Sequence, residues 1–405
     1  MRKPDAVPVL MYHSVARPDD LAPQGWAQRL STSPDLMEAT LATWKRTGWS
    51  TIGLTELSAW LDGRGTIPPK SLVLTLDDGY VDNWTCLHPL LRAYGCKAVV
   101  FVSTDFIDPR SGCRPQDGQA REPGALKAYL SADEMRTMEA DGSVEIGSHA
   151  KTHTWWFVSD RIVDWYRPEV RVSNRESLYR FLWLNAHPDR KPFVLADMDD
   201  ETIPWGTPIY AFAPALVARR FVPDAAETGA TIEHVRTHGG ASFFQKEGWR
   251  AELDGLVHRC RSGEGGRGAW ETEDERRRRV EGELAESRAT LSAVLGRDVR
   301  MLSCPQGAMT EDVEAIAESV GYDRWTMSVW RHGKLNRPGA SRRHIYRCGR
   351  GYELFPASWG RAAATRSHGI VLERYAGSTW ARLATAGLSA LGKALGSGSR
   401  DESPS

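Results

Sequence analysis

The chain has 405 residues, of which 41% are hydrophobic and 26% are charged, as in ordinary globular proteins. Lysine plus arginine equals aspartate plus glutamate at 52 each, so the net charge of zero excludes a global field that would attract nucleic acid. No apolar run approaches the ~20 residues of a membrane span. The six cysteines form no CxxC pair and no secretory signal is evident, which indicates a reduced, cytoplasmic protein.

Short apolar runs alternate with helix-like segments along most of the chain. The apolar runs predict seven buried strands, near residues 7–15, 72–76, 96–103, 144–148, 299–304, 325–329 and 344–346. Capping residues, early acids and terminal glycines predict helices over residues 33–44, 55–61, 83–94, 131–141, 271–295 and 310–320. Strand followed by helix predicts βα units, and therefore a parallel sheet or barrel.

The segment from Thr154 to about Trp270 lacks this alternation and holds seven of the chain's 16 tryptophans. It follows the end of the fourth strand, so we predict that it emerges on the active-site face as a cap or a substrate wall. Tryptophan faces stack on sugar rings, which fits a glycan-binding wall. The same tryptophans could instead form a small core of the segment itself.

Two further stretches have a distinctive pattern. Arg276 to Arg279 lie between acids in the predicted helix 271–295, which indicates a solvated helix face rather than a nucleic-acid patch. Residues 377–396 place Trp380, Leu383 and further leucines on one helical face. This pattern fits either a docked terminal helix or a weak contact with a membrane surface. We expect residues 396–405 to be disordered.

Two adjacent acids, Asp77 and Asp78, follow the buried strand 72–76 directly. They lie at the carboxyl end of that strand, where active sites of parallel α/β folds collect. Neighbouring carboxylates repel each other unless a cation lies beside them. A metal ion could be coordinated by one carboxylate and leave the other free to act as a base. The alternative is an ordinary solvated Asp-Asp-Gly turn.

Histidines end two other predicted strands. His149 and His153 follow the fourth strand, and their spacing of four lets two imidazoles share one cation. Residue 150 is alanine, so this is not the HExxH motif of zinc proteases, and Asp78 is the obvious oxygen donor for a third ligand. Asp77 would then remain free as a base. His13 ends the first strand, as either a functional or a hydrogen-bonded structural histidine.

These motifs resemble those of the polysaccharide deacetylase family, the NodB-homology domain of the carbohydrate esterases. The family motif T-F-D-D-G is similar to residues 75–79, and H-[ST]-x-x-H is similar to residues 149–153 with Ala150 at the small hydroxyl position. The resemblance implies Asp77 as the base and a divalent metal ion, Zn²⁺ above all. It implies the ligands Asp78, His149 and His153.

The resemblance also implies an α/β fold, a distorted (β/α)7 barrel of the NodB type with a large insertion after the fourth strand. The expected divisions are residues 1–153 and 271–350 for the two parts of the barrel, 154–270 for the insertion and 351–405 for a C-terminal extension. The Tyr12-His13 opening is similar to the branch that deacetylates N-acetylglucosamine exopolysaccharides, which implies His13 as the catalytic acid.

The third family motif, R-x-P-Y-G, is altered in residues 303–307. The arginine that orients the base is replaced by Ser303, and the tyrosine is replaced by Gln306, whose amide could still donate to an oxyanion. The candidates to supply the missing guanidinium are Arg342, Arg343 and Arg347. The residues expected to contact the substrate are Tyr80, Pro305 and Trp155.

The predicted function is hydrolysis of an N-acetyl group on an amino sugar, in a polysaccharide, glycolipid or glycoside precursor, by activated water. The insertion favours short or terminal sugars. The alternative is a catalytically silent carbohydrate-binding domain that retains the metal site, which the lost arginine would explain. A glycoside hydrolase is disfavoured, because adjacent acids on one turn do not flank a scissile bond.

Overall fold

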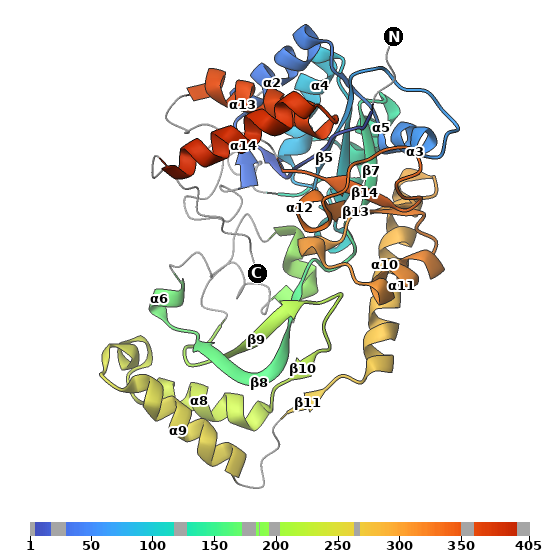
Figure 1. Cartoon of the computed structure of the whole chain (residues 1–405). Coiled ribbons are helices and arrows are strands. Elements are labelled where there is room, and N and C mark those ends of the chain that lie inside the picture. The colour runs from blue at the N-terminus through green and yellow to red at the C-terminus, as the bar shows by residue number, and fades with distance from the viewer. Residues whose placement is uncertain are drawn as a thin grey trace.

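The computed structural model describes residues 5–17, 30–116, 128–171, 184–185, 187–193, 203–262, 268–349 and 360–394. Within them, seven parallel strands form one sheet in the order β1-β5-β6-β7-β12-β13-β14 (Figure 1). They are β1 (Val9–Tyr12), β5 (Ser71–Leu76), β6 (Ala98–Val102), β7 (Val144–Ser148), β12 (Met301–Leu302), β13 (Arg324–Ser328) and β14 (His344–Arg347). Each coincides with one of the seven predicted strands. The short strand β4 (Ser50–Thr51) pairs beside β5.

The first and last strands of this sheet meet. The Met11 N–H donates to the Cys348 carbonyl at 2.8 Å, and the Cys348 N–H donates to the Val9 carbonyl at 2.8 Å. These bonds come directly after β14 and bring the sheet close to full closure. The predicted distorted (β/α)7 barrel is therefore confirmed, with a large insertion after its fourth strand, β7.

Helices cover the outside of the barrel, so strands such as β5 and β6 are buried at every residue. The helices are α2 (Pro34–Thr47), α3 (Leu54–Leu61), α4 (His88–Tyr94), α5 (Ala132–Ala140), α10 (Glu273–Leu295) and α11 (Glu311–Ser319). Local sequence fixes several of their ends. The Ser33 side chain caps α2, Gly48 ends it in the left-handed conformation, and Ser131 forms a capping box with Glu134 at the start of α5.

The insertion folds around its own core. Strands β8 (Trp155–Trp165) and β9 (Pro208–Pro214) form an antiparallel pair, and helices α8 (Ala225–Thr237) and α9 (Trp249–Ser262) pack beside it (Figure 1). A second short pair joins β10 (Phe221–Val222) to β11 (Ala269–Trp270). The tryptophans that pack in the core are Trp165, Trp205 and Trp249. For these three, the prediction of a core of their own is right. Trp183 lies outside the described residues.

Arginines of α10 join the insertion to the barrel. Arg276 donates to the carbonyl of Leu216, and Arg279 donates to the carbonyls of Ala215 and Ala218 at 2.9 and 3.0 Å. Only 5% of the surface of Arg276 is exposed. The prediction of a solvated face is therefore wrong for these two arginines, because backbone carbonyls of the insertion lie against them and accept hydrogen bonds from their guanidinium groups.

Two helices follow the barrel. Helix α13 (Gly360–Tyr375), which the sequence analysis did not predict, buries Val371, Leu372 and Tyr375 in the main core. Helix α14 (Thr379–Ala394) coincides with the predicted C-terminal helix. It buries Ala381, while Trp380 and Leu383 are 61% and 71% exposed. The predicted disordered tail lies outside the described residues. Among those residues, no helix combines the length and hydropathy needed to cross a membrane.

Candidate metal centre and active site

The carboxyl ends of the barrel strands bring the candidate residues together. Asp77 and Asp78 follow β5, His149 follows β7, Ser303 follows β12, and Arg347 is the last residue of β14. Because all these strands are parallel, their carboxyl ends meet at one end of the barrel. Residues up to 270 positions apart in sequence, such as Asp77 and Arg347, are therefore in direct contact.

Asp78, His149 and His153 form the predicted ligand triad. The Nε2 atoms of His149 and His153 lie 3.3 and 3.1 Å from Asp78 Oδ1. One ligand atom from each residue lies within 4.8 Å of the other two. Two imidazole nitrogens and a carboxylate oxygen are the donor set of many catalytic zinc sites. The three residues can therefore bind a divalent metal ion.

The hydrogen bonding of His149 supports this interpretation. Its Nδ1 lies 2.6 Å from the carbonyl oxygen of Ser303, so Nδ1 carries the proton and Nε2 is directed at Asp78. In the described part of the chain, neither carboxylate oxygen of Asp78 accepts a hydrogen bond of good geometry, although both are buried. A buried carboxylate that faces imidazole nitrogens needs a positive charge beside it. A metal ion fits that place.

The charges around the triad are strongly coupled. Burial would raise the pKa of Asp78, but His153 and His149 outweigh it and hold that pKa well below its usual value. Burial would lower the pKa of His149, but Asp77 and Asp78 outweigh it and raise that pKa. Both shifts have one cause, which is that carboxylates and imidazoles share a site that excludes water. Asp78 is therefore ionised and available as a ligand.

Arg347 supplies the guanidinium that the altered third motif lacks. It donates to both oxygens of Asp77, at 2.6 and 2.8 Å, and to the hydroxyl of Ser303 at 2.9 Å. Burial would raise the pKa of Asp77, but Arg347 outweighs this effect and lowers it. Arg343 instead pairs with Glu318, and Arg342 is exposed. Of the three candidates, the structure selects Arg347.

His13 lies beside this pair. Its ring is close enough to Asp78 and Asp77 for both to act on its pKa, but burial is the larger effect and lowers that pKa below the usual 6.5. The end of β1 is held in place by residues that the sequence analysis missed. Asn83 donates to the His13 carbonyl, and the carboxylate of Asp82 accepts from the Ser14 hydroxyl and the Val15 N–H, each at 2.8 Å.

Unusual backbone conformations concentrate at the site. Among the described residues, four non-glycine residues have a positive φ, namely Asp78 (74°), Ala150 (56°), His153 (44°) and Gln306 (54°). Left-handed backbone is strained for residues with a side chain, and it persists where surrounding contacts enforce it. All four residues belong to the three motifs. Their backbone strain is therefore an independent sign of a functional site.

Helix α10 supports the loop that carries the histidines. The Glu283 carboxylate, which is 7% exposed, accepts from the Thr152 N–H and hydroxyl at 3.1 and 2.7 Å. The Ser287 hydroxyl donates to the Ala150 carbonyl at 2.9 Å. These bonds help to hold His149 and His153 in place. The role of Glu283 leaves no local signal in the sequence, because its partner is 131 residues away.

The remaining predicted site residues lie at or near the same end of the barrel. Gln306 places its side-chain amide 3.4 Å from His153 Nδ1, so it is positioned to orient that imidazole, and its role toward an oxyanion stays a prediction. Pro305 is buried. The Tyr80 ring is 2% exposed and stacks on Tyr129 with ring centroids 5.3 Å apart. Trp155 is half-buried and meets Phe212 edge-on. Substrate contact by Tyr80, Pro305 and Trp155 also stays a prediction.

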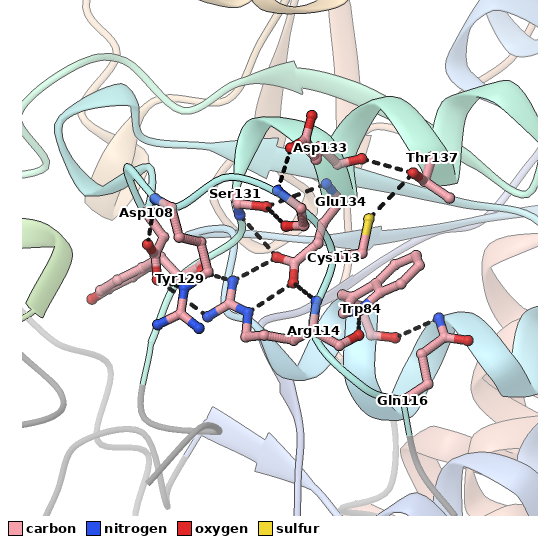
Figure 2. Close-up of polar contacts among 12 residues, drawn as sticks. Trp84, Asp108, Cys113, Arg114, Gln116, Tyr129, Ser131, Asp133, Glu134 and Thr137 are labelled. Carbon is pink, nitrogen blue, oxygen red and sulfur yellow. Dashed lines mark hydrogen bonds and ion pairs between the residues drawn. The ribbon is translucent and has the colours of Figure 1, made fainter. Parts of the chain in front are cut away.

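A buried ionic network surrounds Arg114 and Glu134, and Figure 2 shows its contacts. Arg114 donates to Glu134, to Asp108 and to the carbonyl of Tyr129. Beside it, the Leu130 N–H donates to the Gly79 carbonyl at 2.9 Å, which joins this segment to the turn after Asp78. Tyr129 in turn contacts Phe106, whose ring meets His153 edge-on. The network thus fixes the aromatic side of the site.

The fold and site define an α/β barrel with a candidate Asp-His-His metal centre at the carboxyl ends of its strands. Comparison with known proteins agrees. Residues 64–176 match the polysaccharide deacetylase family. A putative polysaccharide deacetylase of Bacillus subtilis, YxkH, is 27% identical over 151 residues, which are 37% of this chain and 44% of YxkH. The chain therefore matches less than half the length of that relative. The resemblance to the polysaccharide deacetylase family is confirmed.

One solved structure shows the same arrangement of elements. A de-N-acetylase from Aggregatibacter actinomycetemcomitans is similar with a TM-score of 0.51 and 17% identity, covering 85% of this chain and 94% of the other. The BpsB deacetylase domain from Bordetella bronchiseptica has a TM-score of 0.49 and 20% identity, covering 86% and 97%. At such low identity, the first likeness establishes the arrangement of the elements only.

Proposed function

We propose that the chain is a metal-dependent carbohydrate N-deacetylase, which removes an N-acetyl group from an amino sugar. The observation that carries this proposal is the ionised base Asp77, paired with Arg347, beside the Asp78-His149-His153 triad. A divalent ion held by the triad would act as a Lewis acid toward the acetamide carbonyl and would make a water molecule more acidic. The two nitrogens and one oxygen of the triad favour Zn²⁺ over harder ions.

Asp77 is suited to remove the proton of the attacking water. Its pKa is lowered, so it is ionised at neutral pH, and both of its oxygens are held by Arg347. The bidentate pair fixes the orientation of the carboxylate before the substrate arrives. The water oxygen bonds to the carbonyl carbon while its proton passes to Asp77.

His13 is suited to complete the reaction. When the C–N bond breaks, the sugar nitrogen must gain a proton, and the protonated imidazole of His13 can give it. Burial lowers the pKa of His13, which makes its protonated form a stronger acid that is scarcer at neutral pH. The products are acetate and a free amine.

The argument for a catalytically silent carbohydrate-binding domain no longer holds. That alternative was based on the missing motif arginine, and Arg347 now occupies the position beside the base. The small side chain of Ser303 leaves room for this guanidinium and accepts a hydrogen bond from it. No feature of the described site favours binding without turnover.

The substrate and the location of the protein are further parts of the proposal. A cytoplasmic location is part of the proposal, because the six cysteines form no disulfide in the structure. The substrate would then be a glycolipid, glycoside or polysaccharide precursor inside the cytoplasm. The exposed Trp380 and Leu383 of α14 support a weak contact with a membrane surface. Cell fractionation tests the location, and sedimentation with anionic lipid vesicles, compared between the wild type and Trp380→Ala, tests the contact.

The direct test measures acetate release from N-acetylated sugars after metal removal by a chelator and after addition of Zn²⁺. The proposal predicts release only with the metal. Binding of the sugar without release would select the silent domain, and new reducing ends without acetate would select a glycosidase.

A further inference from the structure

A second group of metal-binding side chains lies in the insertion, on the two helices at the end of the molecule opposite the barrel (Figure 1). His234 lies in the last turn of α8, His238 caps the end of that helix, and Glu252 lies on α9. One ligand atom from each of these residues lies within 4.8 Å of the other two. We propose that this group binds a transition-metal ion of the zinc type, separate from the centre in the barrel.

The local geometry already prepares each ligand. The imidazoles of His234 and His238 are one helical turn apart and stack with centroids 4.1 Å apart. His238 Nδ1 lies 2.8 Å from the carbonyl oxygen of His234. A proton on Nδ1 therefore donates to that carbonyl and leaves Nε2 as the free ligand atom. This backbone bond is the support that metal-binding histidines usually have.

Glu252 provides the third ligand from the facing helix. Its Oε1 lies 2.8 Å from His234 Nε2, and its Oε2 lies 2.6 Å from Lys246 Nζ. The lysine therefore occupies one carboxylate oxygen and leaves the other for the ion. Tetrahedral zinc with bonds of about 2.0–2.1 Å keeps its ligand atoms roughly 3.3 Å apart, so His234 and Glu252 need to separate by only about 0.5 Å.

The surroundings favour a cation at this point. The carbonyls at the end of α8 carry the negative end of the helix dipole, which attracts positive charge. Phe243 meets the ring of His234 edge-on, with centroids 5.6 Å apart, and holds it in place. The two helices pack through a small core that includes Val235 and Leu253. An ion bound here would fasten α8 to α9 at the surface of that core.

The test counts zinc in the full-length chain, without an affinity tag, after metal removal and dialysis against a Zn²⁺ buffer that supplies more than two ions per chain. The proposal expects His238→Ala to lose one ion per chain relative to the wild type. His258→Ala is the matched control, because this exposed histidine of α9 lies outside the cluster, and it should lose none. Because His238 is exposed, its replacement should leave the circular dichroism spectrum unchanged.

His153→Ala separates the two sites. It removes a ligand of the barrel centre, and in that background His238→Ala should still remove one further ion. Equal zinc content with and without His238 in this background would overturn the proposal, whatever the barrel centre does. The inference therefore stands or falls independently of the deacetylase activity.

Two further variants test the carboxylate. Glu252→Gln should weaken zinc binding at this site at least about tenfold. Losing a residue that only orients a metal ligand already costs that much, and Glu252 is a ligand itself. Lys246→Ala should strengthen it, because the competing cation is gone. If zinc binding depends on His238 but is equally strong in the wild type, Glu252→Gln and Lys246→Ala, the surface histidines bind zinc only adventitiously. That result would refute the site.

Discussion

Replacing Arg347 by methionine tests the assignment of the guanidinium. Arg347 and Asp77 are both buried, and the variant leaves the carboxylate without its partner. Breaking a buried ion pair in this way costs about 3–5 kcal/mol of stability. The matched control is Arg343→Met, which removes the exposed pair with Glu318 and should change stability little. Urea unfolding at neutral pH measures both variants.

The same variant has a defined pH dependence. Arg347 lowers the folded-state pKa of Asp77, so the pair stabilises the fold fully above the unfolded pKa of about 3.9 and loses this effect as the pH falls through the lower folded value. In Arg347→Met the pKa of Asp77 should rise. The acid limb of kcat/KM should therefore move to higher pH.

Two double variants sharpen the argument. Asp77→Asn with Arg347→Met should cost less stability than Arg347→Met alone, because no buried charge is left unpaired. Ser303→Arg with Arg347→Ser returns the arginine to its position in the family motif, from which it can reach Asp77, and should restore part of the activity. If Arg347→Met leaves the acid limb and the unfolding free energy unchanged, the assigned role of Arg347 is refuted.

Three further predictions concern the rest of the site. The basic limb of kcat/KM should lie below pH 6.5, because burial lowers the pKa of His13, and should vanish in His13→Ala; an unaltered pH profile in that variant would make His13 merely structural. Arg114→Met should cost about 3–5 kcal/mol in urea unfolding, since Glu134 is fully buried, whereas the half-exposed Arg110→Met should cost far less; equal losses would contradict the network. Replacing residues 154–270 by a short Gly/Ser linker should raise KM for short or terminal N-acetyl sugars with the barrel metal retained; an undiminished kcat/KM would show that the insertion does not form a wall of the site.

The strands and the triad could be predicted because their signals are local. Strand β5 is a nearly continuous apolar run that is followed directly by Asp77 and Asp78, and the shorter apolar signal of β7 is followed directly by His149. In a parallel barrel that placement alone brings Asp78 and His149 to the same end. The sequence could not show which of Arg342, Arg343 and Arg347 supplies the guanidinium beside Asp77. That choice depends on the closure of β14 against β1, which pairs residues more than 330 positions apart.

Other features were missed for related reasons. Arg114 and Glu134 are both buried and pair with each other across 20 positions of sequence, so neither residue has a local partner that would indicate its burial. Helix α13 has a weak amphipathic pattern, and its burial comes from packing against α2 and the main core. The arginines of α10 look solvated in sequence because their partners are carbonyls of the insertion. Long-range contacts of this kind leave no periodic signal.

The most direct test of the account is acetate release by the zinc-loaded protein and by zinc-loaded Asp77→Asn, with the metal content of both measured in the same samples. The substituted amide keeps the shape of the side chain but cannot accept the proton, and Asp78, His149 and His153 remain as ligands. The variant should retain the barrel metal and lose at least the ~10²-fold of rate that general base catalysis supplies. Acetate release at the wild-type rate by the metal-loaded variant would contradict it.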